Sequence, residues 1–399
     1  MQGILLLSDN ILSMILARKF KLQTSQEQHQ VLLETLNQYK QAINTVFEYG
    51  FQHKQVSGIS LHNATYYDIR GSTQLPSQLV CSARCKATEA LKAIKSRTKG
   101  KFNTKQPKSS KYPTIRFDMN SCNITNTSVK FSTISKPGRI EVPLISYPFA
   151  RDIKWKDVQK TCELQYQASK KEWYLIIFIN VQEPKPKVSN KILGIDRGCK
   201  HVAVCSDNTF FNSKHLINVK SRYHYLRKRL QSKGTKSSKK LLKKISGREH
   251  RFVQDVNHCI SKKIVNMPFD TFVFEKLHIK RKKEQGKRFN SILNGWSYFQ
   301  LEQFVTYKAA LAGKQVAYVD ARYTSQKCSS CGHVSRSNRV SQSSFKCKVC
   351  DFKLHADLNA SRNIAQNYKA VLATSSNSRV QSIARTTRCE AASSPTALA

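Results

Sequence analysis

The chain has 399 residues, of which 68 are Lys or Arg and 25 are Asp or Glu, so its formal net charge is +43. This length allows two or three compact modules, and an apolar content of 40% is enough for folded cores beneath a heavily charged surface. The charge argues against partners that are only small acidic molecules. It favours nucleic acid as the partner, because each neutralised phosphate releases counterions. A basic surface kept only for solubility is the less favoured explanation of the charge.

The cysteine pattern and the first residues both bear on where the protein works. Four of the twelve cysteines form two C-x2-C pairs and the others are scattered, which is not the pattern of a secreted disulfide framework. The apolar N-terminal run is interrupted by Asp9, is too short for a membrane span and lacks the basic region of a signal peptide. We therefore expect a soluble cytoplasmic protein in a reducing compartment, with no membrane association.

The N-terminal half combines a helical block with short strands. Residues 15–22 are typical of a strand, and we expect residues 1–13 to be an unstructured extension. Apolar residues recur at helical spacing between Ser25, a plausible N-cap, and Gly50. Further helices are expected at 63–68 and 77–96, and strands at 114–119, 128–134, 139–144, 162–167 and 173–181. These strands indicate a small antiparallel barrel, which the strand at 15–22 could join so that the helical block becomes an insertion.

Beyond the extended polar segment 182–190, which is the best domain boundary, the pattern becomes α/β. Residues 214–251 carry 14 Lys or Arg against the single acid Glu249 and keep a helical apolar spacing, which indicates a helix pair with one basic face. Strands are expected at 192–196, 202–206, 272–277 and 316–319, and a helix at 297–312. The Ser/Ala/Thr-rich end of the chain is expected to be disordered.

The strongest metal signal is the pattern Cys328-x2-Cys331-x15-Cys347-x2-Cys350. Each C-x2-C pair can present two thiolates from one tight turn, and two such turns complete a tetrahedral Zn2+ site. Four cysteines leave no open position, so we expect one structural zinc ion. The nearby His333 and His355 are interpreted as ordinary surface histidines.

Three acids form the second group of candidate residues. Asp196 and Glu275 stand at or near the ends of apolar strands, and Asp357 opens a helix-like segment. Carboxylates are preferred ligands of Mg2+, and two ions held between them can promote phosphodiester hydrolysis. Asp320 also ends a strand, and we interpret it as structural. Trp296 and Tyr298 are interpreted as core residues.

Several motifs together resemble the TnpB proteins encoded by bacterial insertion sequences, which are ancestors of the type V CRISPR effectors. The motifs are GIDRG at 194–198, FEKL at 274–277, NGWSYFQLEQFVTYKAALAG at 294–313, YTSQKCSSCG at 323–332 and HADLNASRNI at 355–364. The resemblance is specific from about residue 190 to 368, and upstream it includes YPTIRF at 112–117.

The resemblance implies an α+β multidomain protein: an RNase H-like RuvC α/β nuclease domain with a zinc-ribbon insertion, and an N-terminal β-barrel wedge domain with a helical insertion. The implied boundaries are a disordered extension 1–13, wedge 14–24 and 101–185, helical recognition domain 25–100, nuclease 191–322 with basic helices 214–268, zinc ribbon 323–352, nuclease 353–370 and disordered tail 371–399.

The resemblance also implies RNA-guided DNA cutting in a bacterial cytoplasm or nucleoid. Asp196, Glu275 and Asp357 would hold Mg2+ or Mn2+, and a transposon-derived guide RNA would direct a monomeric ribonucleoprotein to double-stranded target DNA beside a short adjacent motif. The residues expected to contact nucleic acid are His62, Gln78, Thr125 and Asn126 for the adjacent motif, and Arg222, Arg227, Arg229, Lys280, Arg281, Lys282 and Lys283 for the guide–target duplex.

Two alternatives remain open from the sequence. One is a DNA transposase that transfers strands with the same three carboxylates. The other is a transposition regulator that binds DNA without guided cleavage.

Overall fold

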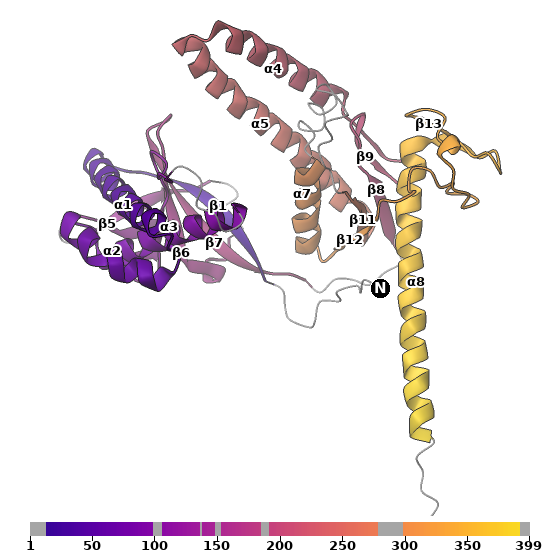
Figure 1. Cartoon of the computed structure of the whole chain (residues 1–399), viewed down its shortest axis with the longest axis horizontal. Coiled ribbons are helices and arrows are strands. Elements are labelled where there is room, and N and C mark those ends of the chain that lie inside the picture. Colours follow the sequence, from indigo (N-terminus) through magenta and orange to yellow (C-terminus); the bar gives the residue numbers. More distant parts are fainter. Residues whose placement is uncertain are drawn as a thin grey trace, which may run out of the picture. The chain divides into compact units, whose positions relative to one another are not determined.

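The structure is a computed structural model that describes residues 13–98, 106–135, 138–147, 153–184, 191–277 and 298–391. The chain forms two compact units, Met1–Gln182 and Glu183–Ala399 (Figure 1). It passes from one unit to the other at the start of the polar segment in which a boundary was expected. The predicted N-terminal extension lies outside the described residues, apart from Ser13.

The first unit contains a seven-stranded antiparallel sheet in the order β2-β6-β7-β1-β5-β4-β3. The strand at the start of the chain pairs along its whole length with β7, so it lies inside the sheet, as the sequence predicted. The strands are β1 (Ser13–Leu22), β2 (Ile115–Phe117), β3 (Cys122–Ile124), β4 (Ser128–Ser132), β5 (Arg139–Ile145), β6 (Val158–Gln167) and β7 (Glu172–Gln182). Of these, only the three-residue β3 was not predicted.

Three helices are inserted in the chain between β1 and β2. They are α1 (Gln26–Gln52), α2 (Gly58–Ser72) and α3 (Ser77–Arg97). The predicted N-cap of α1 is confirmed, because Ser25 and Gln28 bond to each other's backbone N–H groups in a capping box. A single hydrophobic core joins helices and sheet, with Phe20, Tyr39 and Trp173 among its buried members.

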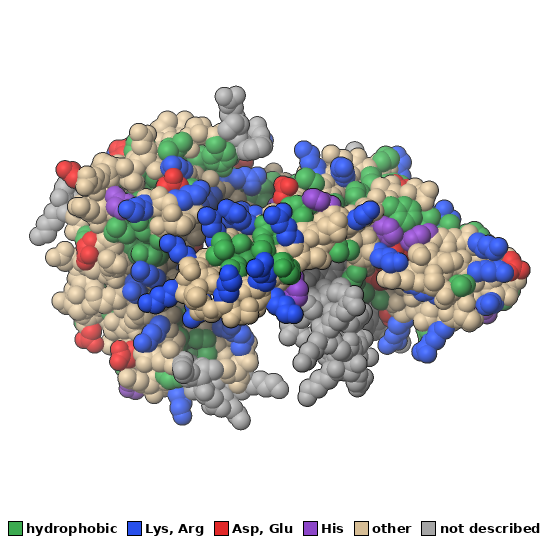
Figure 2. Space-filling view, turned by 90° about the horizontal axis from the view of Figure 1, so that it is seen from above, with side chains coloured by type: hydrophobic (Ala, Val, Ile, Leu, Met, Phe, Trp, Pro, Cys, Tyr) green, Lys and Arg blue, Asp and Glu red, His purple; other side chains and the backbone are tan. Residues whose placement is uncertain are grey.

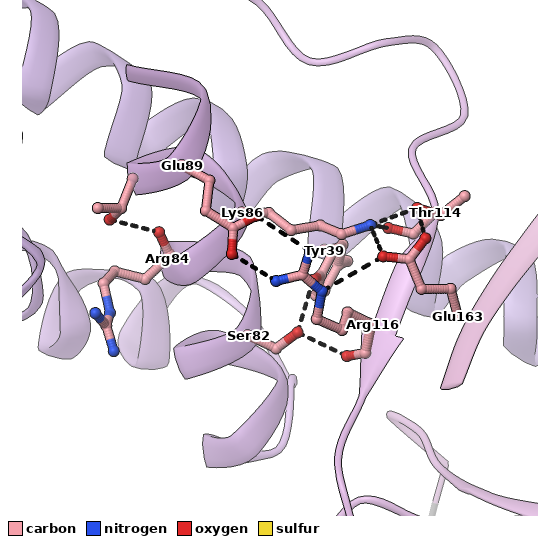
Figure 3. A network of polar contacts seen from close by, with 9 residues as sticks. Tyr39, Ser82, Arg84, Lys86, Glu89, Thr114, Arg116 and Glu163 are labelled. Carbon is pink, nitrogen blue, oxygen red and sulfur yellow. Dashed lines mark hydrogen bonds and ion pairs between the residues drawn. The ribbon is translucent and has the colours of Figure 1, made fainter. Parts of the chain in front are cut away.

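A polar network also fastens α3 to two strands of this sheet (Figure 3). Arg116 on β2 donates to both carboxylate oxygens of Glu89 on α3, at 2.7 and 3.1 Å. Lys86 on α3 pairs with Glu163 on β6 at 3.1 Å, and Ser82 donates to the backbone carbonyl of Arg116 at 2.6 Å. The helices are therefore held to the sheet by both apolar packing and charge pairing.

The second unit contains a five-stranded mixed sheet in the order β10-β9-β8-β11-β12. Its strands are β8 (Ile192–Asp196), β9 (His201–Cys205), β10 (Phe210–Asn212), β11 (Thr271–Lys276) and β12 (Gln315–Asp320). Strands β8, β11 and β12 are parallel, whereas β8, β9 and β10 form an antiparallel meander. The strands expected at 192–196 and 202–206 are confirmed as β8 and β9, which pair antiparallel, and β10 was not predicted.

Helices cover both faces of this sheet. One face packs against α5 (Lys236–Val265) and α7 (Tyr298–Leu311), and the other packs against α8 (Ala356–Ala391). The first core contains Leu193, Ile195, Ile260, Ile264, Phe272, Phe274, Leu301 and Val305. The second core contains Ile192, Val273, Val319, Ile364 and Ala365.

The basic region forms the predicted helix pair, α4 (Lys214–Lys233) and α5, which projects from the sheet as a hairpin (Figure 1). The left-handed Gly234, at φ +63°, ends α4 and permits the sharp reversal. Arg227 and Glu249 form an ion pair between the two helices. Lys and Arg side chains spread over the visible face of the molecule, with few Asp or Glu among them (Figure 2).

One prediction about the C-terminal end is wrong. Residues 371–399 were expected to be disordered, but α8 continues to Ala391. The stretch 371–391 contains neither Gly nor Pro, so nothing in it interrupts a helix that has already begun on the sheet. None of the described helices is both long enough and apolar enough to cross a membrane.

Candidate functional site

Strand register brings the first two predicted acids together. Phe274 of β11 pairs with Ile195 of β8, and the same parallel register places Glu275 opposite Asp196 at the carboxyl ends of both strands. Neighbouring strands lie about 4.8 Å apart. Ile195 and Phe274 point to the α5–α7 face, so the alternation of side chains turns Asp196 and Glu275 to the α8 face.

The third acid, Asp357, lies in the first turn of α8, which packs unusually close to β8. A Cβ atom on Gly194 would lie 2.1 Å from the carbonyl oxygen of Ser361 and 2.7 Å from the backbone nitrogen of Ala365. Only glycine therefore allows the helix to pack directly on the strand backbone at this point. Asp357 lies on the same side of the helix one turn before Ser361, and this packing brings it to the ends of β8 and β11.

The three carboxyl groups line one cavity of about 300 Å3. Burial, and then the charges of Glu275 and Asp357, raise the pKa of Asp196 to about 8. Burial also raises the pKa of Glu275. Carboxylates that are desolvated and repel one another are stabilised by a bound divalent cation, so the donor set fits Mg2+ or Mn2+.

Neighbouring side chains hold the acids in place. The hydroxyl of Thr324 donates to a carboxylate oxygen of Glu275. Arg339 donates to Oδ1 of Asp357 at 3.2 Å, while Nδ1 of His201 lies 3.2 Å from Oδ2 of the same residue. None of these three neighbours was predicted, because each is contributed by a different loop or strand.

A buried arginine supports the same strand ends. The side chain of Arg197 is 1% exposed, pairs with Glu302 of α7 and donates to the backbone carbonyl of Glu275 at 2.8 Å. Its guanidinium also lies over the ring of Phe274, 4.9 Å from the centroid. Arg197 directly follows Asp196, so it ties the end of β8 to both β11 and α7.

His355 is not an ordinary surface histidine, contrary to the prediction. Its ring centroid lies 5.3 Å from that of His201, and its Nδ1 accepts a hydrogen bond from the backbone N–H of Asp357 at 3.3 Å. His355 ends β14 (Lys353–His355) two residues before Asp357. The fold of residues 323–352, called the cysteine module below, then turns the His355 ring toward β9. The short spacing between His355 and Asp357 was the only signal in the sequence.

The four predicted cysteines converge at a separate centre. Their sulfur atoms all lie within 4.8 Å of one another, with Cys328–Cys350 at 3.7 Å and Cys331–Cys347 at 3.6 Å. Zn–S bonds of about 2.3 Å in a tetrahedron require sulfur separations of about 3.8 Å. The residues therefore fit a structural zinc ion.

The structure also places Asp320, the acid that was interpreted as structural. Asp320 ends β12 beside Lys276, its carboxylate is largely exposed, and it pairs with Arg322 at 3.7 Å. It does not line the cavity of the three acids. Trp296 and the side chain of Tyr298 lie outside the described part of the chain, so their assignment to the core stays a prediction.

The predicted nucleic-acid contacts lie on both units. In the first unit, His62 lies on α2, Gln78 in the first turn of α3, and Thr125 and Asn126 in the turn between β3 and β4. In the second unit, the exposed Arg222 and Arg229 lie on α4 together with the paired Arg227. Lys280, Arg281, Lys282 and Lys283 lie outside the described residues.

Known protein families match the second half of the chain. The model OrfB_IS605, described as a probable transposase, matches residues 174–285, and the model of the Cas12f1-like TNB domain matches residues 298–364. A TnpB-like protein of Methanocaldococcus jannaschii is 32% identical over 152 residues, which are 37% of this chain and 54% of that protein. The putative RNA-guided DNA endonuclease InsQ of Escherichia coli is 29% identical over 51% of this chain and 55% of its own length. The second half of the chain is thus similar to TnpB-like proteins.

The similarity extends to CRISPR effectors. The endodeoxyribonuclease Cas12f1 of Sulfoacidibacillus thermotolerans is 33% identical over 221 residues, which are 49% of this chain and 50% of that protein. The chain thus spans about half the length of the curated relatives that it matches. A Cas12f1 structure solved with single-guide RNA and target DNA superposes with a TM-score of 0.59 at 18% identity, covering 86% of this chain and 83% of that chain, which shows a shared fold.

Proposed function

We propose that this protein is an RNA-guided DNA endonuclease that cuts target DNA through Asp196, Glu275 and Asp357. The observation that carries the proposal is the convergence of these acids, from three separate elements, in one cavity of a chain that is similar to TnpB-like proteins. The names of its relatives support it, since InsQ is a putative RNA-guided DNA endonuclease and Cas12f1 an endodeoxyribonuclease.

The proposal assigns a role to each unit. The second unit is an RNase H-like RuvC nuclease domain, supported by its sheet of a meander followed by two parallel strands and by carboxylates at adjacent strand ends. The cysteine module, between β12 and α8, is its zinc-ribbon insertion. The first unit is a wedge domain whose antiparallel sheet carries the recognition helices as an insertion.

The nuclease site fits two divalent cations. Bound Mg2+ or Mn2+ would supply a water nucleophile at neutral pH and stabilise the leaving oxygen of the phosphodiester. Asp196 and Glu275 would hold the ions from strand ends whose spacing is fixed by the sheet. Asp357 would hold them from the start of α8, oriented by Arg339 and His201.

The basic surfaces would bind the nucleic acids. A guide RNA and a double-stranded DNA target are the proposed partners, and Arg222, Arg227 and Arg229 on α4, with the basic cluster 280–283, would contact the backbone of the guide–target duplex. His62, Gln78, Thr125 and Asn126 would read the adjacent motif in DNA. Since Arg227 already pairs with Glu249, a phosphate would have to compete for it, whereas Arg222 and Arg229 are exposed.

The proposal is tested by sequencing the RNA that co-purifies with the protein expressed beside its native flanking DNA. A dominant structured RNA would then be reprogrammed to target a plasmid library with randomised flanking sequence. Cutting that needs the guide, the matching target and a divalent cation supports the proposal. The Asp196→Ala variant should bind RNA and target DNA without cutting, and retained cutting would refute the site assignment.

A second candidate activity is strand transfer by the same carboxylates, favoured by the description of the matching model as a probable transposase. The reaction products discriminate between the two. Guided hydrolysis leaves cut target DNA, whereas a transposase joins transposon ends to the target.

A further inference from the structure

The cysteine module contributes side chains to the carboxylate cavity. Thr324, at the base of the module, donates to Glu275, and Arg339, between the two cysteine pairs, donates to Asp357. Both residues line the cavity together with Asp196. A module that only stabilised the fold would not need to reach two of the three acids.

Arg339 is fixed by contacts that depend on the cysteine turns. Its neighbour Asn338 is fully buried and donates to the carbonyl of Gln326 before the first turn, at 3.0 Å, and to that of His333 after it, at 3.2 Å. The side-chain oxygen of Asn338 accepts from the backbone N–H of Lys348 inside the second turn, at 3.0 Å. Asn338 thus links both turns to the residue that holds Asp357.

The helix that carries Asp357 is clamped to the same module. Asn359 donates to the carbonyl of Lys327 at 2.8 Å and accepts from the N–H of Ser329 at 3.0 Å. The buried Asn363, one turn later, donates to the carbonyls of Thr324 and Lys327 at 2.8 and 2.7 Å. The first cysteine turn and the start of α8 therefore form one hydrogen-bonded body.

Arg339 can orient the carboxylate of Asp357 and still leave lone pairs of its oxygens available to a cation. Each carboxylate oxygen has two lone pairs, so Oδ1, bonded to Arg339, and Oδ2, bonded to His201, both keep one for a cation. Arg339 also donates to the carbonyl of Gln342 at 2.8 Å, and this second bond fixes the direction of its guanidinium.

We propose that the cysteine module controls the nuclease site: zinc at the four cysteines fixes Arg339 through Asn338, and Arg339 acts as a positioning residue that sets the cation affinity of the carboxylate site. This inference rests on the proposed function for the role of that site. Its consequence is that zinc content and divalent-cation affinity are linked within one chain, although the two kinds of metal bind at different centres.

The test compares Arg339→Ala with Arg336→Ala in the full-length chain. Arg336 is exposed, lies in the same module and does not line the cavity, so its variant loses the same charge. Binding of Mn2+ to RNA-free protein is followed by electron paramagnetic resonance. The Mn2+ binding that is lost in the Asp196→Ala variant is assigned to the carboxylate site. We expect Arg339→Ala to weaken this binding about 10- to 100-fold with zinc content unchanged. Arg336→Ala should leave it unaltered.

A zinc-site variant tests the link to the cysteines. Cys350→Ser should lower Mn2+ affinity as Arg339→Ala does, and the double variant should show little further loss, because both changes act through one connection. Unchanged Mn2+ affinity in Arg339→Ala, or additive losses in the double variant, would overturn the inference. If Arg339→Ala loses zinc or unfolds, Arg339→Lys, which keeps the charge but not the paired bonds, takes its place under the same criteria.

Cleavage assays separate this inference from the proposed function. In wild type, absence of guided cleavage despite Mn2+ binding would refute the proposed function and leave the linkage measurable. If wild type cuts, Arg339→Ala should need about 10- to 100-fold more Mn2+ for half-maximal cutting while binding target DNA normally. If wild type and Arg339→Ala need the same Mn2+ concentration for half-maximal cutting, the inference about Arg339 is contradicted while the proposed function stands.

Discussion

Replacement of Gly194 by alanine should impair the nuclease site without removing any of its acids. The new methyl group would lie 2.1 Å from the carbonyl oxygen of Ser361, a backbone atom that no side-chain rotation can relieve. To reach 3.0 Å, the limit below which real contacts of this kind essentially never fall, α8 would have to move away by about 1 Å. Misplacement of this size can lower a rate about 100-fold, and overpacking costs about 1–3 kcal/mol of stability.

The matched control for this change is Gly71→Ala. Gly71 lies in α2, and a Cβ atom there would meet nothing within 4 Å. Single-turnover cleavage of a guided DNA substrate should be measured well below the unfolding temperature of each variant, with target binding measured in parallel. Gly194→Ala should bind but cut about 100-fold more slowly, whereas Gly71→Ala should behave as wild type. Cutting by Gly194→Ala within twofold of wild type would refute the argument that close packing of α8 positions Asp357.

Three further predictions concern the acids and the cysteines. Asp196→Ala should abolish cutting while keeping guide and target binding in gel-shift assays, and residual metal-dependent cutting would contradict its role. Cys328→Ser should lower zinc content in elemental analysis and the melting temperature, whereas Ser at the exposed Cys259 should change neither. Because the pKa of Asp196 is raised from 3.8 to about 8 in the folded state, its protonated form stabilises the fold below about pH 4 and this stabilisation is lost as pH rises to about 8. Without Mg2+, the free energy of unfolding should therefore fall over that pH window, and added Mg2+ should restore more of it at pH 8 than at pH 5. The Asp196→Asn variant should show a weaker pH dependence of its free energy of unfolding. Equal pH profiles for this variant and wild type in chemical denaturation would count against the pKa shift.

Local structure could be predicted from the sequence where the signal is local. The capping box at Ser25 and the period of α1 are fixed by residues within a few positions of one another. The two C-x2-C pairs likewise carry their own turn geometry, so the convergence of four sulfur atoms followed from spacing. The three-residue β3 and β10 were missed because so short a run carries no period of its own and is a strand only beside its partner.

The amino-acid sequence by itself thus determined which residues are the candidates for the chemistry: three acids in an acid-poor chain and four paired cysteines. Only the tertiary structure decided how they meet. Glu275 faces Asp196 because β8 and β11 pair in parallel, with partner residues 79 positions apart in the sequence. Asp357 lies beside them because Gly194 has no side chain and lets α8 pack closely on β8. Arg339 of the cysteine module reaches Asp357 of α8 by a hydrogen bond, and His355 meets His201 of β9 only in the folded chain. Helix α8 extends past residue 370 because the part packed on the sheet starts the helix. Such contacts depend on distances across the fold, which no local pattern of residues encodes.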